Sequence, residues 1–313
     1  MCGIVGYIGH RDAYPIVIKG LKRLEYRGYD SAGLVLFDGD VLKLSKTKGK
    51  VSALESICDK ENTKIGKIGM GHTRWATHGV PNDVNSHPHF SNSGKLVVIH
   101  NGIIENYDSL KRELISLGYT FKSETDTEVL TYLIDDIKQK SNVSIGEAVR
   151  LALHQVVGAY AIVVLSKENP NQLIAARKSS PLVVGIGKEG DFYLASDATP
   201  IVEYTKRVVY MEDEEIAVVD LNEGLKLYGI DDVAKTPYVQ ELEIQLEALE
   251  KGGYEHFMLK EIHEQPRSIK DCFRGRLNAQ EGWVNLGGIK DYEEKMANAN
   301  RIIMIACGTS WHA

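Results

Sequence analysis

Short, β-branched runs separated by amphipathic stretches fill roughly the first 220 residues, and this pattern restricts the possible folds more than any other sequence feature. Runs such as GIVGYI, LVVIH and AIVVL are bounded by small or polar residues, which is typical of strands. The strands expected from such runs lie at 2–8, 32–37, 67–72, 95–100, 159–165, 171–176, 181–186, 191–196, 207–211 and 215–220. Apolar stripes at helical spacing predict helices around 17–24, 107–117 and 129–137. Sheets covered by helices, in an α+β protein, are therefore expected.

The charge of the chain argues against nucleic-acid or anionic-membrane partners. The 313 residues carry a formal net charge of -6 at pH 7, and no basic run is interleaved with aromatic residues. Proteins that bind those partners usually carry a basic excess. No segment approaches the roughly 18 consecutive apolar residues of a membrane span. We therefore expect neither nucleic acid nor membrane among the partners.

The cysteines indicate a reducing compartment. Cys2, Cys58, Cys272 and Cys307 are widely separated, and none are paired at CxxC spacing. A chain of this length with so few cysteines is not a disulfide scaffold. We therefore expect a cytoplasmic protein.

The composition changes after the strand-rich part. Residues 231–253 are polar and acidic, with a short helix expected before Gly252 and Gly253. Helical material follows and is expected to break near Pro266. The last stretch, RIIMIACGTSWHA, predicts a buried strand and a small-residue turn without a following helix. The chain is therefore expected to be truncated.

Cys2 stands directly in front of the first apolar run. Removal of Met1 would leave a thiol and a free α-amine on one residue. An α-amine has a pKa of about 7.7–8.0, which suits it to act as a general base toward the neighbouring thiol. The structural alternative is an inert cysteine in an edge strand.

The stretch KIGMGHTRWATHGVPNDVNSHPHF, residues 67–90, carries one arginine and several histidines after a strand. The guanidinium of Arg74 has the fork geometry that binds both oxygens of a carboxylate. A polar surface loop is one alternative. A zinc site that uses His72, His78, His87 and His89 is another, but no HExxH or paired CxxC motif supports it. We expect no metal.

Asn101 and Gly102 follow a strand and precede the amphipathic stretch IIENYDSLKREL. An Asn-Gly pair after a strand is often a hairpin turn. Here a helix is expected to follow, so the Asn amide and the Gly N–H could form an oxyanion hole.

Two pairs of residues match the capping-box pattern at the start of a helix, Thr125 with Glu128 and Ser144 with Glu147. The first pair places Asp126 in the first helical turn, where it either only supports the helix or also binds an ammonium group. GIGKEG (185–190) matches GxGxxG, but strands are expected on both sides of it. A dinucleotide site requires a helix there, so we interpret this stretch as a hairpin and expect no cofactor.

Taken together, the motifs resemble the glutaminase domain of the glutamine–fructose-6-phosphate aminotransferases, within the class II glutamine amidotransferases. They are CGIVG (2–6), LEYRGYDSAG (24–33), GHTRWATHG (71–79), NSHPH (85–89), HNGIIEN (100–106) and SETDTE (123–128). KEIHEQP (260–266) and CGTS (307–310) resemble that family's linker and the start of its first sugar-isomerase domain. The resemblance implies a glutaminase domain at 2–225, a linker at 226–265 and a truncated sugar-isomerase domain at 266–313.

The resemblance implies a four-layer α/β/β/α N-terminal-nucleophile fold, with Cys2 as the nucleophile and Asn101 and Gly102 as the oxyanion hole. The other implied roles are glutamine binding by Arg74, Thr77, His78 and Asp126, support of Cys2 by Arg27, closure over glutamine by Trp75, and sugar-phosphate contacts by Thr309 and Ser310.

The implied activity is hydrolysis of glutamine to glutamate and ammonia, which the full-length enzyme, a homodimer, would use to convert fructose 6-phosphate to glucosamine 6-phosphate. Two alternatives remain open. One is an amidotransferase of the amidophosphoribosyltransferase type, and the other is a regulatory module that binds glutamine without turnover.

Overall fold

The computed structural model describes residues 2–242, 253–278, 280–284 and 287–312. Contacts divide the chain into two units, residues 1–246 and 247–313. Every helix in the described residues is too short or too polar to cross a lipid bilayer.

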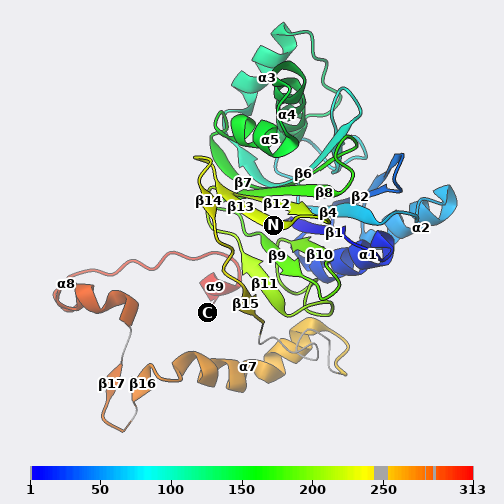
Figure 1. The fold of residues 1–313 in the computed structure, drawn as a ribbon. Helices are drawn as coiled ribbons and strands as arrows, with labels where there is room; N and C mark the ends of the chain where they lie inside the picture. The colour runs from blue at the N-terminus through cyan, green and yellow to red at the C-terminus, as the bar shows by residue number, and fades with distance from the viewer. Residues whose placement is uncertain (1, 243–252, 279, 285–286, 313) are drawn as a thin grey trace. The chain divides into compact units, whose positions relative to one another are not determined.

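Two antiparallel sheets form the centre of the first unit (Figure 1). The eight-stranded sheet has the order β15-β11-β9-β10-β1-β4-β2-β3. Its strands are β1 (Gly3–Ile8), β2 (Ser31–Phe37), β3 (Leu42–Lys48), β4 (Ile68–Arg74), β9 (Val183–Ile186), β10 (Phe192–Ala195), β11 (Arg207–Tyr210) and β15 (Gln240–Glu241). The seven-stranded sheet has the order β14-β13-β12-β8-β7-β6-β5. Its strands are β5 (His89–Phe90), β6 (Leu96–Ile104), β7 (Gly158–Ser166), β8 (Gln172–Lys178), β12 (Glu215–Asp220), β13 (Gly224–Gly229) and β14 (Ala234–Lys235).

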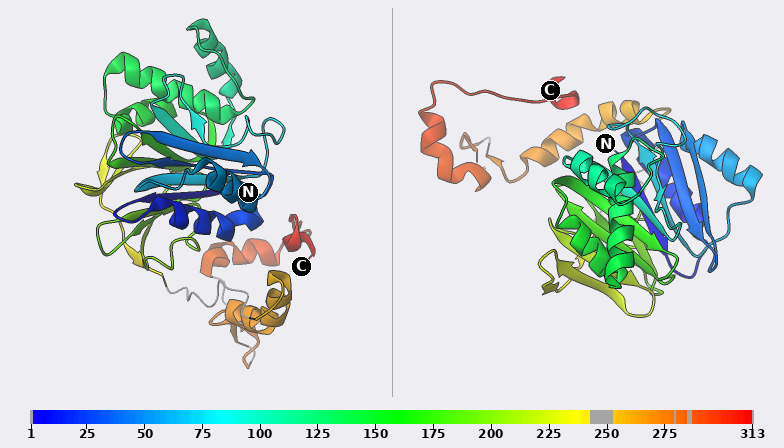
Figure 2. Two further views of the ribbon diagram at one scale, coloured as in Figure 1. Left: turned by 90° about the vertical axis from the view of Figure 1, so that its right-hand side faces the viewer. Right: turned by 90° about the horizontal axis from the view of Figure 1, so that it is seen from above.

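Helices cover the outer faces of the sheets, and the views of Figure 2 show this layering from two further directions. The helices of the first unit are α1 (Ala13–Leu24), the short 3-10 helix η1 (Glu25–Arg27), α2 (Val51–Glu61), α3 (Tyr107–Ser116), α4 (Asp126–Ser141) and α5 (Ile145–Leu153). The first three lie against the eight-stranded sheet, and α3, α4 and α5 lie over the other sheet (Figure 1). The predicted four-layer α/β/β/α fold is confirmed.

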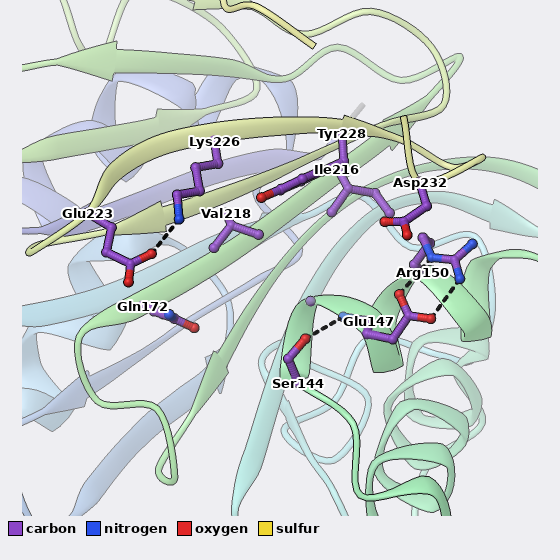
Figure 3. Close-up of a pocket in the computed structure, with 11 residues that line it drawn as sticks. Ser144, Glu147, Arg150, Gln172, Ile216, Val218, Glu223, Lys226, Tyr228 and Asp232 are labelled. Carbon is purple, nitrogen blue, oxygen red and sulfur yellow. Dashed lines mark hydrogen bonds and ion pairs between the residues drawn. The ribbon is translucent and has the colours of Figure 1, made fainter. Parts of the chain in front are cut away.

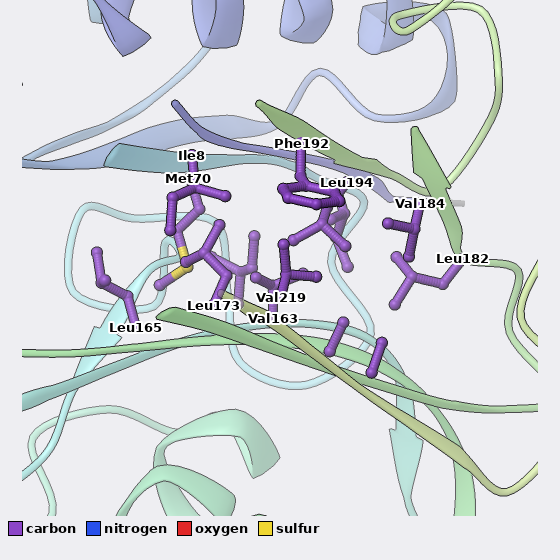
Figure 4. Close-up of a cluster of buried hydrophobic side chains, with 14 of the residues drawn as sticks. Ile8, Met70, Val163, Leu165, Leu173, Leu182, Val184, Phe192, Leu194 and Val219 are labelled. Atoms are coloured by element: carbon purple, nitrogen blue, oxygen red, sulfur yellow. The ribbon is translucent and has the colours of Figure 1, made fainter. Parts of the chain in front are cut away.

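The main core lies between the two sheets (Figure 4). Ile8 and Met70 point into it from the eight-stranded sheet, and Val163 and Leu173 point into it from the other sheet. Each sheet is also covered by helices, so a central strand such as β2 is buried at every position. Burial on both faces explains why these strands appear in the sequence as continuous apolar runs rather than alternating patterns.

The strands and helices predicted for this unit are present. One of these strands is longer than predicted, and the sheets also contain strands from residues beyond the predicted ones. The strand expected at 95–100 continues to Ile104, because residues 101–104 pair with residues 158–161 of β7. Strand pairing also continues past residue 225, since β13 pairs with β12 and β15 pairs with β11. The sheets therefore include residues of the range 226–265, which the resemblance assigns to a linker. GIGKEG joins β9 to β10, which pair antiparallel as the predicted hairpin.

The second unit contains mostly short elements: α7 (Phe257–Phe273), β16 (Leu277–Asn278), β17 (Trp283–Val284), the 3-10 helix η2 (Gly287–Tyr292), α8 (Glu293–Ala297) and α9 (Thr309–His312). The predicted break near Pro266 is wrong, because α7 continues through this proline. The predicted strand at 301–307 is also wrong. These residues are exposed and irregular, since no neighbouring strand among the described residues pairs with them. The short helix expected before Gly252 falls at residues 243–252, outside the described residues.

Candidate active site

The thiol of Cys2 lies where the first strand begins beside the end of β4. β1 pairs antiparallel with β4, with Gly3 opposite Thr73. This register brings the residues after β4 next to Cys2. The backbone N–H of Trp75 donates a hydrogen bond to Cys2 Sγ at 3.2 Å. The first strand and the loop after β4 thus position the candidate nucleophile together.

A small pocket adjoins this thiol, and most of the site residues predicted from the sequence line it. It is lined by Cys2, Arg74, Trp75, Thr77, His78, His87, His100, Gly102, Thr125, Asp126 and Thr127. The lining comes from both sheets, from the loop after β4 and from the start of α4. Trp75 and Thr77 are exposed at this pocket, whereas Arg74 and Asp126 are buried.

Arg74 presents an unsatisfied cationic group at this pocket. Its Nη2 donates hydrogen bonds to the backbone carbonyls of His78 and Gly79. Its Nη1 is buried and has no hydrogen-bond partner among the described residues. A buried charged donor without a partner is costly, and a carboxylate is the group that best matches a guanidinium. The pocket is therefore suited to an anionic ligand.

Asp126 supplies an opposite charge in the same pocket. Thr125 caps α4 by accepting a hydrogen bond from the N–H of Glu128, as the capping pattern predicts. This cap places Asp126 in the first turn of the helix. Its Oδ2 accepts a hydrogen bond from the N–H of Ile104 at 2.9 Å. A carboxylate has several acceptor positions, so Asp126 can bind an ammonium group while it holds the end of β6.

Asn101 and Gly102 lie on β6 as members of the strand rather than of a turn, and of the two only Gly102 lines the pocket. The Asn101 Nδ2 donates a hydrogen bond to the Cys2 carbonyl at 3.1 Å. Gly102 lines the pocket with a φ of +132°, and a Cβ at this position would lie 2.0 Å from the Ala159 carbonyl oxygen. Only glycine fits this backbone conformation and close approach. An amide and a glycine N–H beside a thiol are the donor types that an oxyanion hole uses.

Burial raises the pKa of the Cys2 thiol above its usual value, and the Trp75 N–H and the Arg74 charge oppose this effect. The thiol is therefore largely protonated near neutral pH in this environment. Nucleophilic attack requires the thiolate, so a base must take its proton.

A cluster of buried histidines lies behind the pocket, and the sequence analysis did not predict this arrangement. The rings of His72 and His87 stack with centroids 4.2 Å apart, and His87 contacts His89 edge-on at 4.9 Å. His100 Nδ1 lies 3.0 Å from the Thr127 hydroxyl, and His87 Nε2 lies 3.2 Å from it. Among the described residues, no group of three or more His, Cys, Asp or Glu side chains is arranged to hold a metal ion. In the structure, the two histidines of the HPH motif make ring contacts within the interior.

Because of these histidines, we expect the free energy of unfolding to fall in mild acid. Burial lowers the pKa of His72 to about 3, and it also lowers those of His87, His89 and His100. Below a pH of about 6.5 the unfolded chain therefore binds more protons than the folded chain, and the free energy of unfolding falls as the pH decreases. Each histidine contributes up to about 1.4 kcal/mol per pH unit in this range. Urea denaturation at pH 7, 6 and 5 measures the effect.

The matched variants for this experiment are His89→Asn, which removes one titrating ring, and Thr131→Val, which changes a buried hydroxyl that does not titrate. His89→Asn should flatten the dependence of stability on pH, whereas Thr131→Val should shift it without changing its slope. An unchanged slope in His89→Asn would contradict the assignment.

Other predicted residues lie outside the pocket lining. Arg27 donates to the Ser196 carbonyl at 3.3 Å, and Ser196 in turn bonds to Ile4 on β1. This contact supports the first strand two residues from Cys2. Thr309 and Ser310 belong to the short helix α9 of the second unit, and Ser310 is exposed. Their proposed contact with a sugar phosphate stays a prediction.

Asp30 and Lys46 position the pocket loops, and the sequence analysis did not identify either of them. Asp30 Oδ2 accepts a hydrogen bond from the N–H of Ala76, and its backbone N–H donates to the Arg74 carbonyl. Lys46 Nζ donates to the Ser86 carbonyl at 2.8 Å. Asp30 occurs in the YRGYDSAG motif, which is the one signal that could have indicated it.

A second pocket, of about 320 Å³, lies where α5 meets β8, β12 and β13 (Figure 3). Its lining is Ser144, Gly146, Glu147, Arg150, Gln172, Ile216, Val218, Glu223, Lys226, Tyr228 and Asp232. Glu147 pairs with Arg150, and Lys226 pairs with Glu223. None of its lining residues carries a buried polar atom without a partner. It is larger than the pocket at Cys2, but no thiol lines it, its Ser144 hydroxyl caps α5 and its Lys226 is paired with Glu223, so the chemistry favours the Cys2 pocket.

Comparison with known proteins identifies the family. A model of the glutamine amidotransferase domain matches residues 58–244. The chain is 60% identical over its whole length to a glutamine–fructose-6-phosphate aminotransferase (isomerizing) of Bacteroides thetaiotaomicron, and 53% identical to one of Chlorobaculum tepidum. In each comparison it covers 51% of the relative. The chain thus spans about half the length of these curated relatives.

Solved structures agree on the fold. A glutamine phosphoribosylpyrophosphate amidotransferase from B. subtilis is similar over 73% of this chain and 49% of its own, with a TM-score of 0.62 and 27% identity. A second structure, titled an allosteric regulatory enzyme of purine biosynthesis, has a TM-score of 0.63 and 29% identity over the same shares of the two chains. The aminotransferase relatives are about twice as identical and match the whole chain. The resemblance seen in the sequence is confirmed: the chain belongs to the glutamine amidotransferase family and has its class II, N-terminal-nucleophile fold.

Proposed function

We propose that this chain hydrolyses L-glutamine to glutamate and ammonia through a thioester on Cys2. The observation that carries this proposal is the buried Nη1 of Arg74, which has no partner in the described ranges and belongs to a residue that lines the same pocket as Asp126 and Cys2. A cationic group and an anionic group in one pocket match the α-carboxylate and α-ammonium of a free amino acid. The thiol and the donors of residues 101 and 102 then face its side-chain amide.

The reaction follows from these groups. The Cys2 thiolate attacks the amide carbon, a C–S bond forms, and the carbonyl π electrons move to the oxygen. The Asn101 Nδ2 and the Gly102 N–H stabilise this oxyanion. Collapse of the intermediate breaks the C–N bond, and the nitrogen leaves as ammonia after it has gained a proton. Water then attacks the thioester, which releases glutamate and restores the thiol.

The base in this proposal is the α-amine of Cys2 after removal of Met1. An α-amine has a pKa near neutrality, so it can accept the thiol proton and later give it to the leaving nitrogen. Thr77 and His78 line the pocket beside Arg74 and would contact the α-carboxylate end of glutamine. Trp75, half exposed beside the thiol, would close over the bound substrate.

The names of the curated relatives support a longer reaction in a full-length protein. We infer that the ammonia serves to convert fructose 6-phosphate to glucosamine 6-phosphate in a homodimer, with Thr309 and Ser310 among the phosphate contacts. All four cysteines are free, which supports a cytoplasmic location.

Steady release of glutamate from L-glutamine tests the proposal. We expect catalytic turnover with L-glutamine and a loss of at least about a hundred-fold in kcat/KM with 4-aminobutanamide, which lacks the α-carboxylate, because Arg74 is then left unpaired. Binding of glutamine without glutamate release would instead identify a regulatory module. Equal turnover of both amides would contradict the role of Arg74.

A further inference from the structure

We propose that His72 is a positioning residue that fixes the orientation of the Asn101 side-chain amide, so that its NH₂ group, rather than its oxygen, faces the Cys2 site. This inference rests on the proposed glutaminase function. It concerns a residue that lies outside the pocket lining and acts only through Asn101.

The contacts define a short chain of hydrogen bonds from the interior to the thiol residue. His72 Nε2 lies 2.9 Å from Asn101 Oδ1 and 3.0 Å from the His100 carbonyl oxygen. On the other side of the amide, Asn101 Nδ2 donates to the Cys2 carbonyl at 3.1 Å. His72 is 1% exposed and Asn101 is 7% exposed, so water is largely excluded from the first of these contacts.

The two backbone carbonyls determine the hydrogen positions along this chain. The His100 carbonyl can only accept, so His72 Nε2 must carry the proton and donate. The atom of Asn101 that faces this N–H must then be an acceptor, which is Oδ1. The NH₂ group therefore points the other way, toward the Cys2 carbonyl, which again can only accept. Both ends select the same orientation of the amide.

The surroundings of His72 maintain this arrangement. Its other ring nitrogen, Nδ1, is buried without a hydrogen-bond partner among the described residues, and its ring stacks on His87. In the Nε2–H tautomer the unpaired atom is an acceptor. The opposite tautomer would bury an unpaired N–H and would direct a lone pair at two oxygens, which is the more costly state. The ring consequently has one stable protonation pattern.

Without His72, the Asn101 Oδ1 would be buried without a donor. An amide can then rotate so that its oxygen faces the oxyanion position, where it would repel the developing charge. The expected effect is on the transition state rather than on glutamine binding. A loss in kcat with little change in KM is therefore the signature of a positioning role.

Kinetics of three variants test the inference. His72→Leu cannot donate and should lose about ten- to a hundred-fold in kcat with an unchanged KM. His72→Gln can place an amide N–H near the position of Nε2 and should recover most of this loss. Thr73→Val is the matched control, because Thr73 is the next residue of β4 and its buried hydroxyl has no hydrogen-bond partner within the described part of the chain. It should retain wild-type kinetics.

A double-mutant cycle separates positioning from general damage. In an Asn101→Ala background, His72→Leu should cause no further loss of kcat, because its target is absent. Additive losses, or a wild-type kcat in His72→Leu, would overturn the inference while leaving glutaminase activity in place. Failure of the wild-type chain to release glutamate would overturn the proposed function instead.

A measurement without turnover completes the test. In protein labelled with ¹⁵N in its histidine rings, the His72 signals can be assigned by their absence from His72→Gln. They should report a neutral ring with the proton on Nε2. A proton on Nδ1 would overturn the inference whatever the kinetics show.

Discussion

Replacement of Cys2 by alanine is expected to abolish glutaminase activity, with a loss in kcat of at least about a thousand-fold. No other thiol lines this pocket, and without a sulfur no thioester can form. Cys2→Ser should also be severely impaired, because an alcohol stays protonated at pH values at which a thiol ionises. Glutamate release under saturating glutamine is the measurement.

Two controls make this result specific. Cys272→Ala changes an exposed thiol of the second unit and should retain full activity. Calorimetric titration of Cys2→Ala with glutamine should still show binding, because Arg74 and Asp126 are unaltered. In the wild-type chain, an electrophilic diazo-ketone analogue of glutamine should add once, to a peptide that begins at Cys2. Residual turnover in Cys2→Ala, or adducts on Cys58 instead, would exclude the thioester mechanism.

Much of the fold was predictable because burial on both faces leaves a clear signal. β1 and β2 are buried at every position, so their sequences are continuous apolar runs. The strand β3 was not predicted from the sequence, because it forms the edge of its sheet. Its sequence, LKLSKTK, is mostly polar and only partly buried, as expected for an edge strand protected by lysines.

The prediction of a strand from composition was wrong at 301–307, where no partner strand lies among the residues that the structure describes. The run at 302–305 is as apolar as a core strand, yet Met304 and Ile305 are both 92% exposed. A strand requires a neighbouring strand for its backbone groups, and local propensity does not supply one. The sequence did not predict the histidine cluster for a related reason. The HPH motif shows that rings are close in sequence, but only the packing of the two sheets, with β4 of one against β6 of the other, places His72 against His87.

The predicted site residues come together because the two sheets meet at the pocket. Cys2 and Arg74 are carried by the eight-stranded sheet, whereas Gly102 lies on the seven-stranded sheet and Asp126 begins the helix above it. The sequence spacing between these residues contains no information on their distances. The resemblance to a known family indicated which residues to group, and the packing of the two sheets explains how they meet. Since both sheets contribute, the site depends on the core between them.

Asn101→Ala is expected to lower kcat by about 100- to 1000-fold, which is the typical effect of removing one oxyanion donor. The Gly102 N–H remains in this variant, so some activity should persist, unlike in Cys2→Ala. KM should change little, because Asn101 bonds to the Cys2 carbonyl and not to the groups that bind the amino-acid end.

Asn101→Asp keeps the shape but places acceptor oxygens toward the developing negative charge, so it should be at least as damaging as alanine. Gln172→Ala, a polar change on β8 away from the Cys2 pocket, is the control and should retain activity. If Asn101→Ala instead raised KM at constant kcat, Asn101 would be a substrate-binding residue, and the oxyanion would depend on the Gly102 N–H and other donors.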